Sequence, residues 1–244
     1  MKTLFVTAAS KGIGAATARL AAANGWNVAL GYFSNKDNVI RLKRELVEHK
    51  VQIETIKLDV TRDRAVAFAF DRISEVFGTL HALVNTAAVT TSRNAFLEFS
   101  ISEYEKVIET NLMGTIRCCH YGAARISNRR GGLGGSIINL SSEAGRFGGD
   151  RISGYAASKG GINSLTLGLA RELAADKIRV NAVSPSIIQD SVGNHPNEGL
   201  GADYKHLPMK RPGTAEEVAQ AIIWLLSDAA SYVSGAVIPV SGAR

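Results

Sequence analysis

The chain has 244 residues, of which 45% are hydrophobic and 20% are charged, a composition typical of a folded globular protein and not of a disordered one. Its 28 Lys and Arg residues exceed 22 Asp and Glu residues by six, but the basic residues are scattered, which argues against a nucleic-acid-binding protein. No apolar run approaches the roughly 18 residues of a membrane span, and no signal peptide is evident. The two cysteines are adjacent, at Cys118 and Cys119, so we expect no disulfide framework and a cytoplasmic location.

Short apolar runs alternate with segments of helical periodicity along the whole chain. Strands are predicted at 4–6, 28–30, 53–58, 80–84, 136–140, 178–183 and 236–240. Helices are predicted at 15–23, 38–49, 66–77, 102–129 and 155–174, with a further one opening at Thr214–Glu217. The long helix from Ser102 and the helix from Thr214 each begin at a predicted capping box, Ser102 with Glu105 and Thr214 with Glu217.

This order predicts an α/β fold: a doubly wound (Rossmann) seven-stranded parallel sheet with helices on both faces, forming a single domain over residues 1–244. Irregular stretches are predicted at 86–101, 143–154 and 186–213, and the last is long enough to be a substrate lid. Cys118 and Cys119 are expected to be packing residues on the long helix, and Trp224 a core residue. The five histidines lack metal-ligand spacing, so no metal site is predicted.

A glycine-containing turn lies between the first strand and the first helix. It comprises Thr7, Ala8, Ala9, Ser10, Lys11, Gly12, Ile13 and Gly14. In this position the backbone N–H groups and the dipole of the helix face an anion, so the turn is a candidate phosphate site. The carboxyl ends of the other strands, where Asp59, Asn85, Ser142 and Pro185 fall, lie at the same edge of such a sheet.

The end of the second strand lacks the acidic residue that usually binds the ribose 2′-hydroxyl of a dinucleotide. It carries Ser34, Asn35 and Lys36 instead, and no acid occurs before Asp37. A carboxylate would repel a 2′-phosphate, whereas these residues and Lys11 could bind one. The pattern favours NADP over NAD.

Tyr155 and Lys159 are four residues apart on a predicted helix, so both side chains project from one face. A free phenol has a pKa near 10, and a neighbouring cation favours its ionised form. Lowering that pKa by about three units requires about 4 kcal/mol of differential interaction. The pair is therefore predicted to exchange a proton at neutral pH.

The Thr7–Gly14 turn, Asn85, Ser142 and the Tyr155–Lys159 pair together resemble the short-chain dehydrogenase/reductase family, with 3-oxoacyl-carrier-protein reductases as the most similar branch. The resemblance covers essentially the whole chain and implies a catalytic set of Asn111, Ser142, Tyr155 and Lys159. Tyr155 would be the acid in carbonyl reduction and the base in alcohol oxidation. Ser142 would hydrogen-bond the substrate oxygen.

In the same resemblance Lys159 would hold the nicotinamide ribose and lower the pKa of Tyr155, while Asn111 would hold the water of a proton relay toward Lys159. Asp59 and Val60 would bracket the adenine. The remaining implied contacts to the cofactor are Asn85, Ala87, Tyr155, and Pro185 to Ile188. The family also implies a homotetramer assembled through the long helices.

The sequence departs from the family at several glycines. Ala8 and Ala88 stand where the family has glycine, and Ser186 and Ala243 lie in further altered motifs. If the backbone at Ala8 or Ala88 needed a positive φ, each methyl group would cost about 1 kcal/mol and could weaken cofactor binding.

These features predict an NADP(H)-dependent oxidoreductase that interconverts a ketone and a secondary alcohol. One alternative is a 3-oxoacyl-carrier-protein reductase, for which Arg129 and Arg130 could supply a basic surface at the mouth of the site, although Asp176 would interrupt it. A second alternative is a catalytically weak NADP-binding regulatory or scaffold protein.

Overall fold

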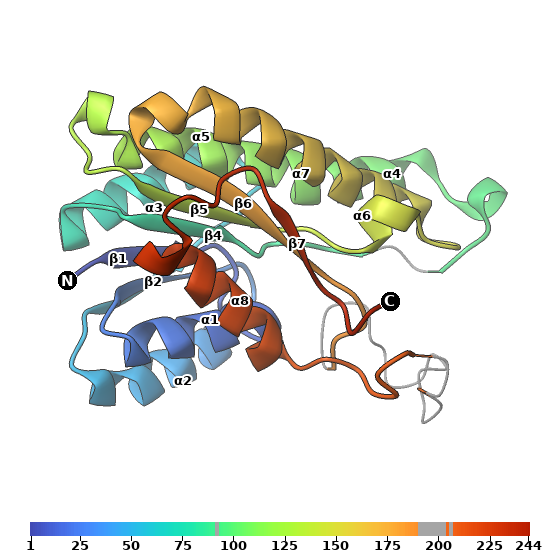
Figure 1. The fold of residues 1–244 in the computed structure, drawn as a ribbon, viewed down its shortest axis with the longest axis horizontal. Coiled ribbons are helices and arrows are strands. Elements are labelled where there is room, and N and C mark those ends of the chain that lie inside the picture. The colour runs from blue at the N-terminus through green and yellow to red at the C-terminus, as the bar shows by residue number, and fades with distance from the viewer. Residues whose placement is uncertain (91–92, 190–203, 205–206) are drawn as a thin grey trace.

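One parallel sheet forms the centre of the protein (Figure 1), seen here in a computed structural model that describes residues 1–90, 93–189, 204 and 207–244. Its strand order is β3-β2-β1-β4-β5-β6-β7. The strands are β1 (Thr3–Val6), β2 (Asn27–Tyr32), β3 (Ile53–Lys57), β4 (Ala82–Asn85), β5 (Gly135–Leu140), β6 (Ile178–Pro185) and β7 (Val237–Val240). All six strand pairs are parallel, which confirms the predicted fold class.

Helices cover both faces of this sheet (Figure 1). One face carries α1 (Gly12–Ala23), α2 (Lys36–Leu46) and α8 (Ala215–Leu226). The other carries α3 (Asp63–Phe77), α4 (Ile101–Val107), α5 (Gly114–Ile126) and α7 (Ser153–Glu172). The short helix α6 (Ala144–Phe147) follows β5, and 3₁₀ turns occur at Val47–His49, Phe96–Glu98, Asn128–Arg130, Ala174–Asp176 and Asp228–Ala230.

Each face of the sheet buries its own apolar cluster. Leu4, Val6, Val28 and Leu30 pack under α1, α2 and α8, whereas Phe5 packs with Phe70 under α3 and α5. Successive residues of one strand thus alternate between the two clusters, as the pleat requires. The strands are therefore buried on both sides, and only their ends and connections can reach a ligand.

The long helix differs from its prediction. It begins at Ser100, whose side chain accepts a hydrogen bond from the backbone N–H of Glu103, and not at Ser102. Residues Ile108–Met113 between α4 and α5 are π-helical. Helical turns also occur inside two stretches predicted to be irregular, at Phe96–Glu98 and at Ala144–Phe147. π-Helical turns inside longer helices are frequent at functional sites.

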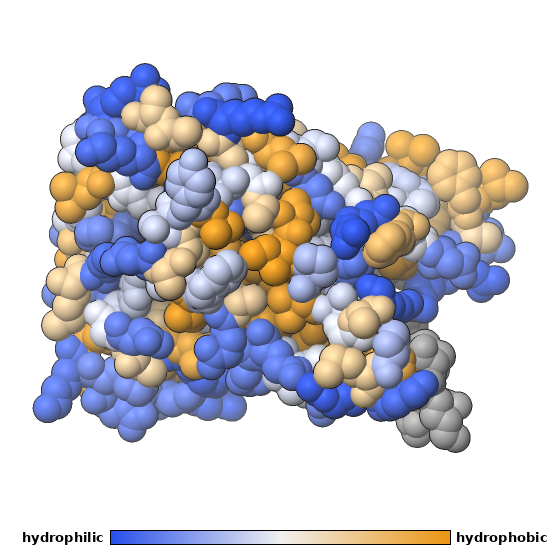
Figure 2. All heavy atoms as spheres, viewed as in Figure 1, coloured by the Kyte–Doolittle hydropathy of each residue, from blue (hydrophilic) through white to orange (hydrophobic). Residues whose placement is uncertain are grey.

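Two predictions about apolar side chains have opposite outcomes. Cys118 and Cys119 are free, buried in α5, and protonated, because burial raises the pKa of both thiols, that of Cys119 to about 12. Trp224, predicted to be a core residue, is 43% exposed, because α8 turns Val218, Ile222 and Leu225 toward the sheet instead. Figure 2 shows hydrophobic atoms gathered over the middle of this view, where α8 and β7 lie in Figure 1.

Within the part of the chain that the structure describes, no helix is long and apolar enough to cross a membrane. Nor do the described His, Cys, Asp and Glu residues form a group of three or more that could hold a metal ion.

Candidate active site

The candidate catalytic residues come from three elements that meet at the carboxyl edge of the sheet. Ser142 follows β5, Tyr155 and Lys159 lie on α7, and Asn111 lies in the π-helical segment. Helix α7 packs against both α6 and this π-helical segment, which brings the four residues into one region. Ligands of doubly wound sheets bind at this edge.

Lys159 is buried, with 2% of its surface exposed. Its Nζ donates to the Leu140 carbonyl oxygen at 2.6 Å and lies 5.6 Å from the centroid of the Tyr155 ring. Burial lowers the pKa of the amine to about 7. The sequence predicted a cation at this position. With this pKa, only part of the Lys159 side chains carry the ammonium form at neutral pH.

The half-buried phenol of Tyr155 behaves differently from its prediction. Burial raises its pKa above the ordinary value of 10, and a hydrogen bond with Ser142 opposes the shift without reversing it. The predicted lowering by Lys159 is not found, because burial of the phenol itself has the larger effect on its pKa. Tyr155 consequently holds its proton at neutral pH, which suits a proton donor.

Ser142 is oriented by its own chain. Its Oγ accepts a hydrogen bond from the backbone N–H of Ala144 at 3.2 Å. The hydroxyl hydrogen therefore remains available, and the side chain lies beside the phenol of Tyr155. The pair can present two hydroxyl groups to one substrate oxygen.

Asn111 is fully buried and holds the segment that follows β4. Its Oδ1 accepts from the Val89 N–H at 2.8 Å, and its Nδ2 donates to the Val89 carbonyl oxygen at 3.0 Å and to Ser158 Oγ at 3.1 Å. Ser158 in turn donates to the Tyr155 carbonyl oxygen at 2.7 Å. The hydrogen bonds of this side chain thus lead to the backbone of Tyr155 and not to Lys159, so the predicted water relay stays a prediction.

The glycine turn fits a phosphate group. Gly12 has a φ of +56°, and a Cβ at Gly14 would lie 1.8 Å from the Ala8 carbonyl oxygen, so the turn and α1 approach closely. Among the described residues no side chain caps the N-terminus of α1, although Ser10 and the exposed Lys11 lie in the turn and Ile13 in the first turn of the helix. An anion there would meet open backbone N–H groups and the helix dipole.

Two hydroxyl groups tie this turn to the end of β4. Thr7 Oγ1 accepts from the N–H groups of Thr86 and Ala87, at 3.0 and 3.2 Å. Thr86 Oγ1 accepts from the Ala8 N–H and donates to the Ala8 carbonyl oxygen, both at 3.1 Å. Sequence reasoning missed Thr86, whose role depends on the neighbouring strand and leaves no signal in its local sequence.

The backbone at Ala8 and Ala88 is unstrained. Among the described residues, those other than glycine with a positive φ are Lys50, Arg151, Lys177, Lys210 and Ala243. The condition under which the two methyl groups would cost energy is therefore not met, which removes the reason for expecting a weakened cofactor site. Of the four departures only Ala243, with a φ of +67°, takes the left-handed conformation.

The predicted 2′-phosphate contacts surround the end of β2. Ser34, Asn35, Lys36 and Lys11 are all exposed, and the Ala9 N–H bonds the Gly31 carbonyl oxygen at 2.8 Å, so the glycine turn lies beside this strand. These side chains are free to reach an anionic ligand.

The predicted adenine contacts follow β3. Asp59 Oδ1 accepts from the backbone N–H and hydroxyl of Thr61, at 3.0 and 2.7 Å. Val60 is buried, and a Cβ at Gly114 would lie 2.6 Å from its Cγ2. The side chain of Val60 thus packs against α5, which leaves the backbone of 59–60 to line the site.

The side chain of Asn85 belongs to a buried polar network that the sequence did not reveal. Its Nδ2 donates to Asn139 Oδ1 at 2.9 Å and to Cys119 Sγ at 3.3 Å, and Asn139 Nδ2 donates to Thr166 Oγ1 at 3.0 Å. The network links β4, β5, α5 and α7 beneath the site. Its amide nitrogen therefore points into this network, and the contact of Asn85 with a cofactor stays a prediction.

The end of β6 carries the last predicted contacts. Pro185 is the final residue of the strand, and Ile188 is 2% exposed and pairs with Gly213 in a parallel bridge. Beside them lies a cavity of about 290 Å³, lined by Ser186, Ile187, Leu207, Met209, Arg211, Gly213, Glu217, Pro239, Val240, Ser241 and Gly242. Most of the predicted lid, residues 190–203 and 205–206, lies outside the described residues.

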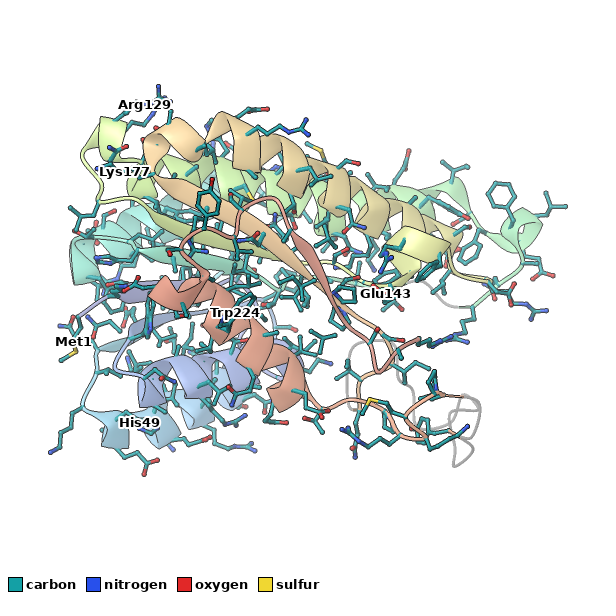
Figure 3. The ribbon with its side chains drawn as sticks, in the orientation of Figure 1. Met1, His49, Arg129, Glu143, Lys177 and Trp224 are labelled. Atoms are coloured by element: carbon teal, nitrogen blue, oxygen red, sulfur yellow. The ribbon has the colours of Figure 1, made fainter. Side chains whose placement is uncertain are left out.

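Arg129 lies far from this edge. Figure 3 places Arg129 and Lys177 at the end of the sheet opposite Glu143, a buried residue next to Ser142. Arg129 is ion-paired with the buried Asp176, which also accepts from Ser127, and these bonds lower the pKa of Asp176 to about 2. Within one chain, Arg129 therefore does not supply the predicted basic surface at the mouth of the site. Its side chain instead joins two 3₁₀ turns at the other edge of the sheet.

Several known proteins that are similar to this chain are named as reductases or dehydrogenases. The family model described as enoyl-(acyl carrier protein) reductase matches residues 7–242. YgfF, an uncharacterized oxidoreductase of Escherichia coli K12, is 38% identical over 100% of both chains. The 3-oxoacyl-[acyl-carrier-protein] reductase FabG of Staphylococcus epidermidis is 34% identical over 99% of this chain and 98% of its own. The solved structure of acetoin dehydrogenase YohF from Salmonella typhimurium matches with a TM-score of 0.89 at 29% identity, over 99% of this chain and 95% of its own.

Proposed function

The chain belongs to the short-chain dehydrogenase/reductase family, and we propose that it is an NADP(H)-dependent oxidoreductase that interconverts a ketone and a secondary alcohol. The observation that carries the proposal is the buried amine of Lys159 5.6 Å from the Tyr155 ring, with the Ser142 side chain beside the phenol. Residues 1–244 would form one catalytic domain, working in the cytoplasm, where the adjacent free cysteines stay reduced.

NADPH, when bound, supplies the hydride, and the protein aligns the substrate and manages the proton. Tyr155 would donate its proton to the carbonyl oxygen as that oxygen gains negative charge. Its raised pKa keeps the proton in place until then. Ser142 would donate a second hydrogen bond to the same oxygen, which stabilises the developing charge.

Lys159 would act on both the phenol and the ribose. Its pKa of about 7 lets the amine change charge near neutral pH. A negative charge left on Tyr155 after proton transfer would favour the ammonium form of Lys159 and so be stabilised by it. The amine would also donate to ribose hydroxyls beside the Leu140 carbonyl oxygen that it contacts.

Removing the phenol hydroxyl tests this mechanism. Tyr155→Phe deletes the proton donor without altering the shape of the ring, so kcat for ketone reduction should fall by about 100-fold or more. Affinity for NADPH, measured by nicotinamide fluorescence, should stay near that of the wild type. Near-normal turnover in this variant would falsify the assigned role of Tyr155.

The preference for NADP is inferred from the end of β2, where Ser34, Asn35 and Lys36 with Lys11 could bind a 2′-phosphate. A titration of the protein with NADPH and with NADH should show tighter binding of NADPH. Lys36→Glu places a carboxylate beside the phosphate position and should reduce that preference by about tenfold, the effect of 1.4 kcal/mol. Equal affinity of the wild type for both cofactors contradicts the inference.

Reduction of 3-oxoacyl thioesters is the second candidate function. The observation in its favour is the 34% identity to a relative named as a 3-oxoacyl-carrier-protein reductase over 99% of this chain. A comparison of kcat/KM for a 3-oxoacyl-carrier protein with that for a small ketone separates the two functions. Preference for the carrier-bound substrate by more than about tenfold, or 1.4 kcal/mol, would select this candidate.

A further inference from the structure

A buried carboxylate lies directly beside the candidate catalytic serine. Glu143 follows Ser142 in the chain and is 6% exposed, and Figure 3 shows it at the end of the strands next to α6. The mechanism derived above does not use it. Burying an ionised group is costly unless it is hydrogen-bonded or paired, so its contacts identify what it does.

Glu143 joins three segments that border the site. Its Oε1 accepts from Ser184 Oγ at 2.7 Å, and its Oε2 pairs with Arg146 Nη1 of α6 at 3.4 Å. Its backbone N–H donates to the Pro185 carbonyl oxygen at 3.0 Å, and its own carbonyl oxygen accepts from the N–H groups of Arg146 and Phe147. The end of β5, the start of α6 and the end of β6 therefore meet at this one residue.

The bond to Ser184 is the least replaceable of these contacts. Ser184 is fully buried, so its hydroxyl has no solvent to turn to if the carboxylate is removed. Arg146, by contrast, keeps 45% of its side chain exposed and can be hydrated. The short bond thus adds a buried side-chain contact to the backbone bonds, Ser141 N–H to the Val183 carbonyl oxygen and Glu143 N–H to the Pro185 carbonyl oxygen, that join the end of β6 to the turn carrying Ser142.

We propose that Glu143 is a positioning residue, which holds the Ser184–Pro185 end of β6 in register with Ser142. This inference rests on the proposed function, in which the end of β6 lies beside the nicotinamide and Ser142 binds the substrate oxygen. Glutamate and glutamine can both accept from Ser184, whereas alanine cannot. The proposal therefore requires an acceptor at this position, which the glutamine variant keeps and the alanine variant removes.

The chain offers a matched control at the opposite edge of the sheet. Asp176 is also 6% exposed, and it too is held by one serine and one arginine, Ser127 and Arg129. Asp176→Ala therefore removes a buried carboxylate of the same kind without disturbing the candidate site. It separates positioning from a general loss of stability.

The test compares Glu143→Ala, Glu143→Gln, Ser184→Ala and Asp176→Ala in the full chain, with thermal unfolding recorded for each. Glu143→Ala should lower kcat by about tenfold or more. It should also raise the NADPH dissociation constant by about threefold or more, as expected when ordered side chains are freed. Glu143→Gln should stay within about threefold of the wild type in both measurements, and so should Asp176→Ala.

Ser184→Ala makes a smaller change than Glu143→Ala and removes the same hydrogen bond, so it replaces that variant if Glu143→Ala does not fold. The proposal would be overturned if Glu143→Ala and Ser184→Ala both kept the wild-type kcat and NADPH affinity. It would also be overturned if Asp176→Ala lost as much of either as they do. Wild-type protein that binds NADPH but reduces no ketone contradicts the proposed function, and the binding comparison still tests Glu143. Wild-type protein that binds no nicotinamide cofactor overturns both.

Discussion

At the scale of single residues, the site places a polar group where the fold favours an apolar one. Lys159 is among the largest fully buried side chains of the described residues, and its amine donates a hydrogen bond to the Leu140 carbonyl oxygen. Its lowered pKa is the sign of that burial. Functional residues of this kind reduce stability, which is the usual trade-off at an active site.

Replacing this lysine should therefore stabilise the protein while inactivating it. Lys159→Met keeps the apolar stem and should raise Tm by about 2–4 °C, the shift that corresponds to about 1 kcal/mol in a chain of this length. Because the folded pKa lies below the unfolded one, the unfolded state binds more protons between pH 10.5 and about 7. The advantage of the variant should thus grow as the pH falls through that range. Thermal scans at pH 7 and pH 10 measure it, and a lower Tm at both values contradicts the argument.

At the scale of elements, hydroxyl groups complete the joint between β1 and β4. Thr7 Oγ1 accepts from the backbone N–H of Thr86, and Thr86 Oγ1 bonds both the N–H and the carbonyl group of Ala8. The two strands are neighbours in the sheet but 78 residues apart in the chain at this point. The phosphate turn is therefore held by a residue that lies far from it in the sequence.

Thr86→Val should weaken this joint. It leaves the N–H of Ala8 without its partner, and an unsatisfied group in such a place costs about 1–3 kcal/mol. Urea denaturation should show that loss, and NADPH binding should weaken with it. Thr86→Ser retains the hydroxyl and serves as the control. Equal stability of the valine and serine variants would show that the hydroxyl contributes nothing.

The elements themselves were largely predictable. All seven strands were predicted because apolar runs bounded by turn residues are strong signals, as β5 and β6 illustrate. The start of the long helix was misplaced because Ser100–Glu103 and Ser102–Glu105 have the same capping pattern. Ser102 makes its hydrogen bond with Ser100 instead. The π-helical turn depends on how that helix packs against α7, which local sequence does not encode.

The candidate site was predictable where its residues act through spacing. The phosphate turn and the Tyr155–Lys159 pair are local patterns, and the structure brings both to the carboxyl edge. The direction of the Tyr155 pKa was wrong, since it depends on burial by other elements. Glu143 was missed for the same reason, because its burial and its bond to Ser184 arise only when β5 and β6 pair.

At the scale of the whole molecule, the two ends of the parallel strands carry different groups. The carboxyl edge carries the candidate site, and the opposite edge is closed by the ion pair of Arg129 and Asp176 (Figure 3). Both faces between them are covered by helices, and α5 and α7 form the outer layer of one face (Figure 1). An assembly that used this layer would leave the carboxyl edge open to substrate.

We expect four chains to assemble through these long helices. Sedimentation velocity should give a mass of four chains of 25.9 kDa each. Leu167→Glu adds a charge to an exposed position of α7 and should shift the distribution toward smaller species. Val47→Glu changes an exposed apolar residue on the α2 side and should not. A wild-type mass of one chain rules out the assembly.

The bridge between Ile188 and Gly213 fixes the two ends of the segment that connects the end of β6 to the start of α8. The Gln189 N–H bonds the Gly213 carbonyl oxygen at 2.9 Å and the Gly213 N–H bonds the Ile187 carbonyl oxygen at 3.0 Å, so both ends are joined independently of what lies between. Doubling the length of a loop whose ends are fixed adds only about 0.6 kcal/mol of closure cost. A change in the length of this segment should therefore add little closure cost, whereas a change at Leu207, Met209 or Arg211 would alter the wall of the cavity beside the end of β6.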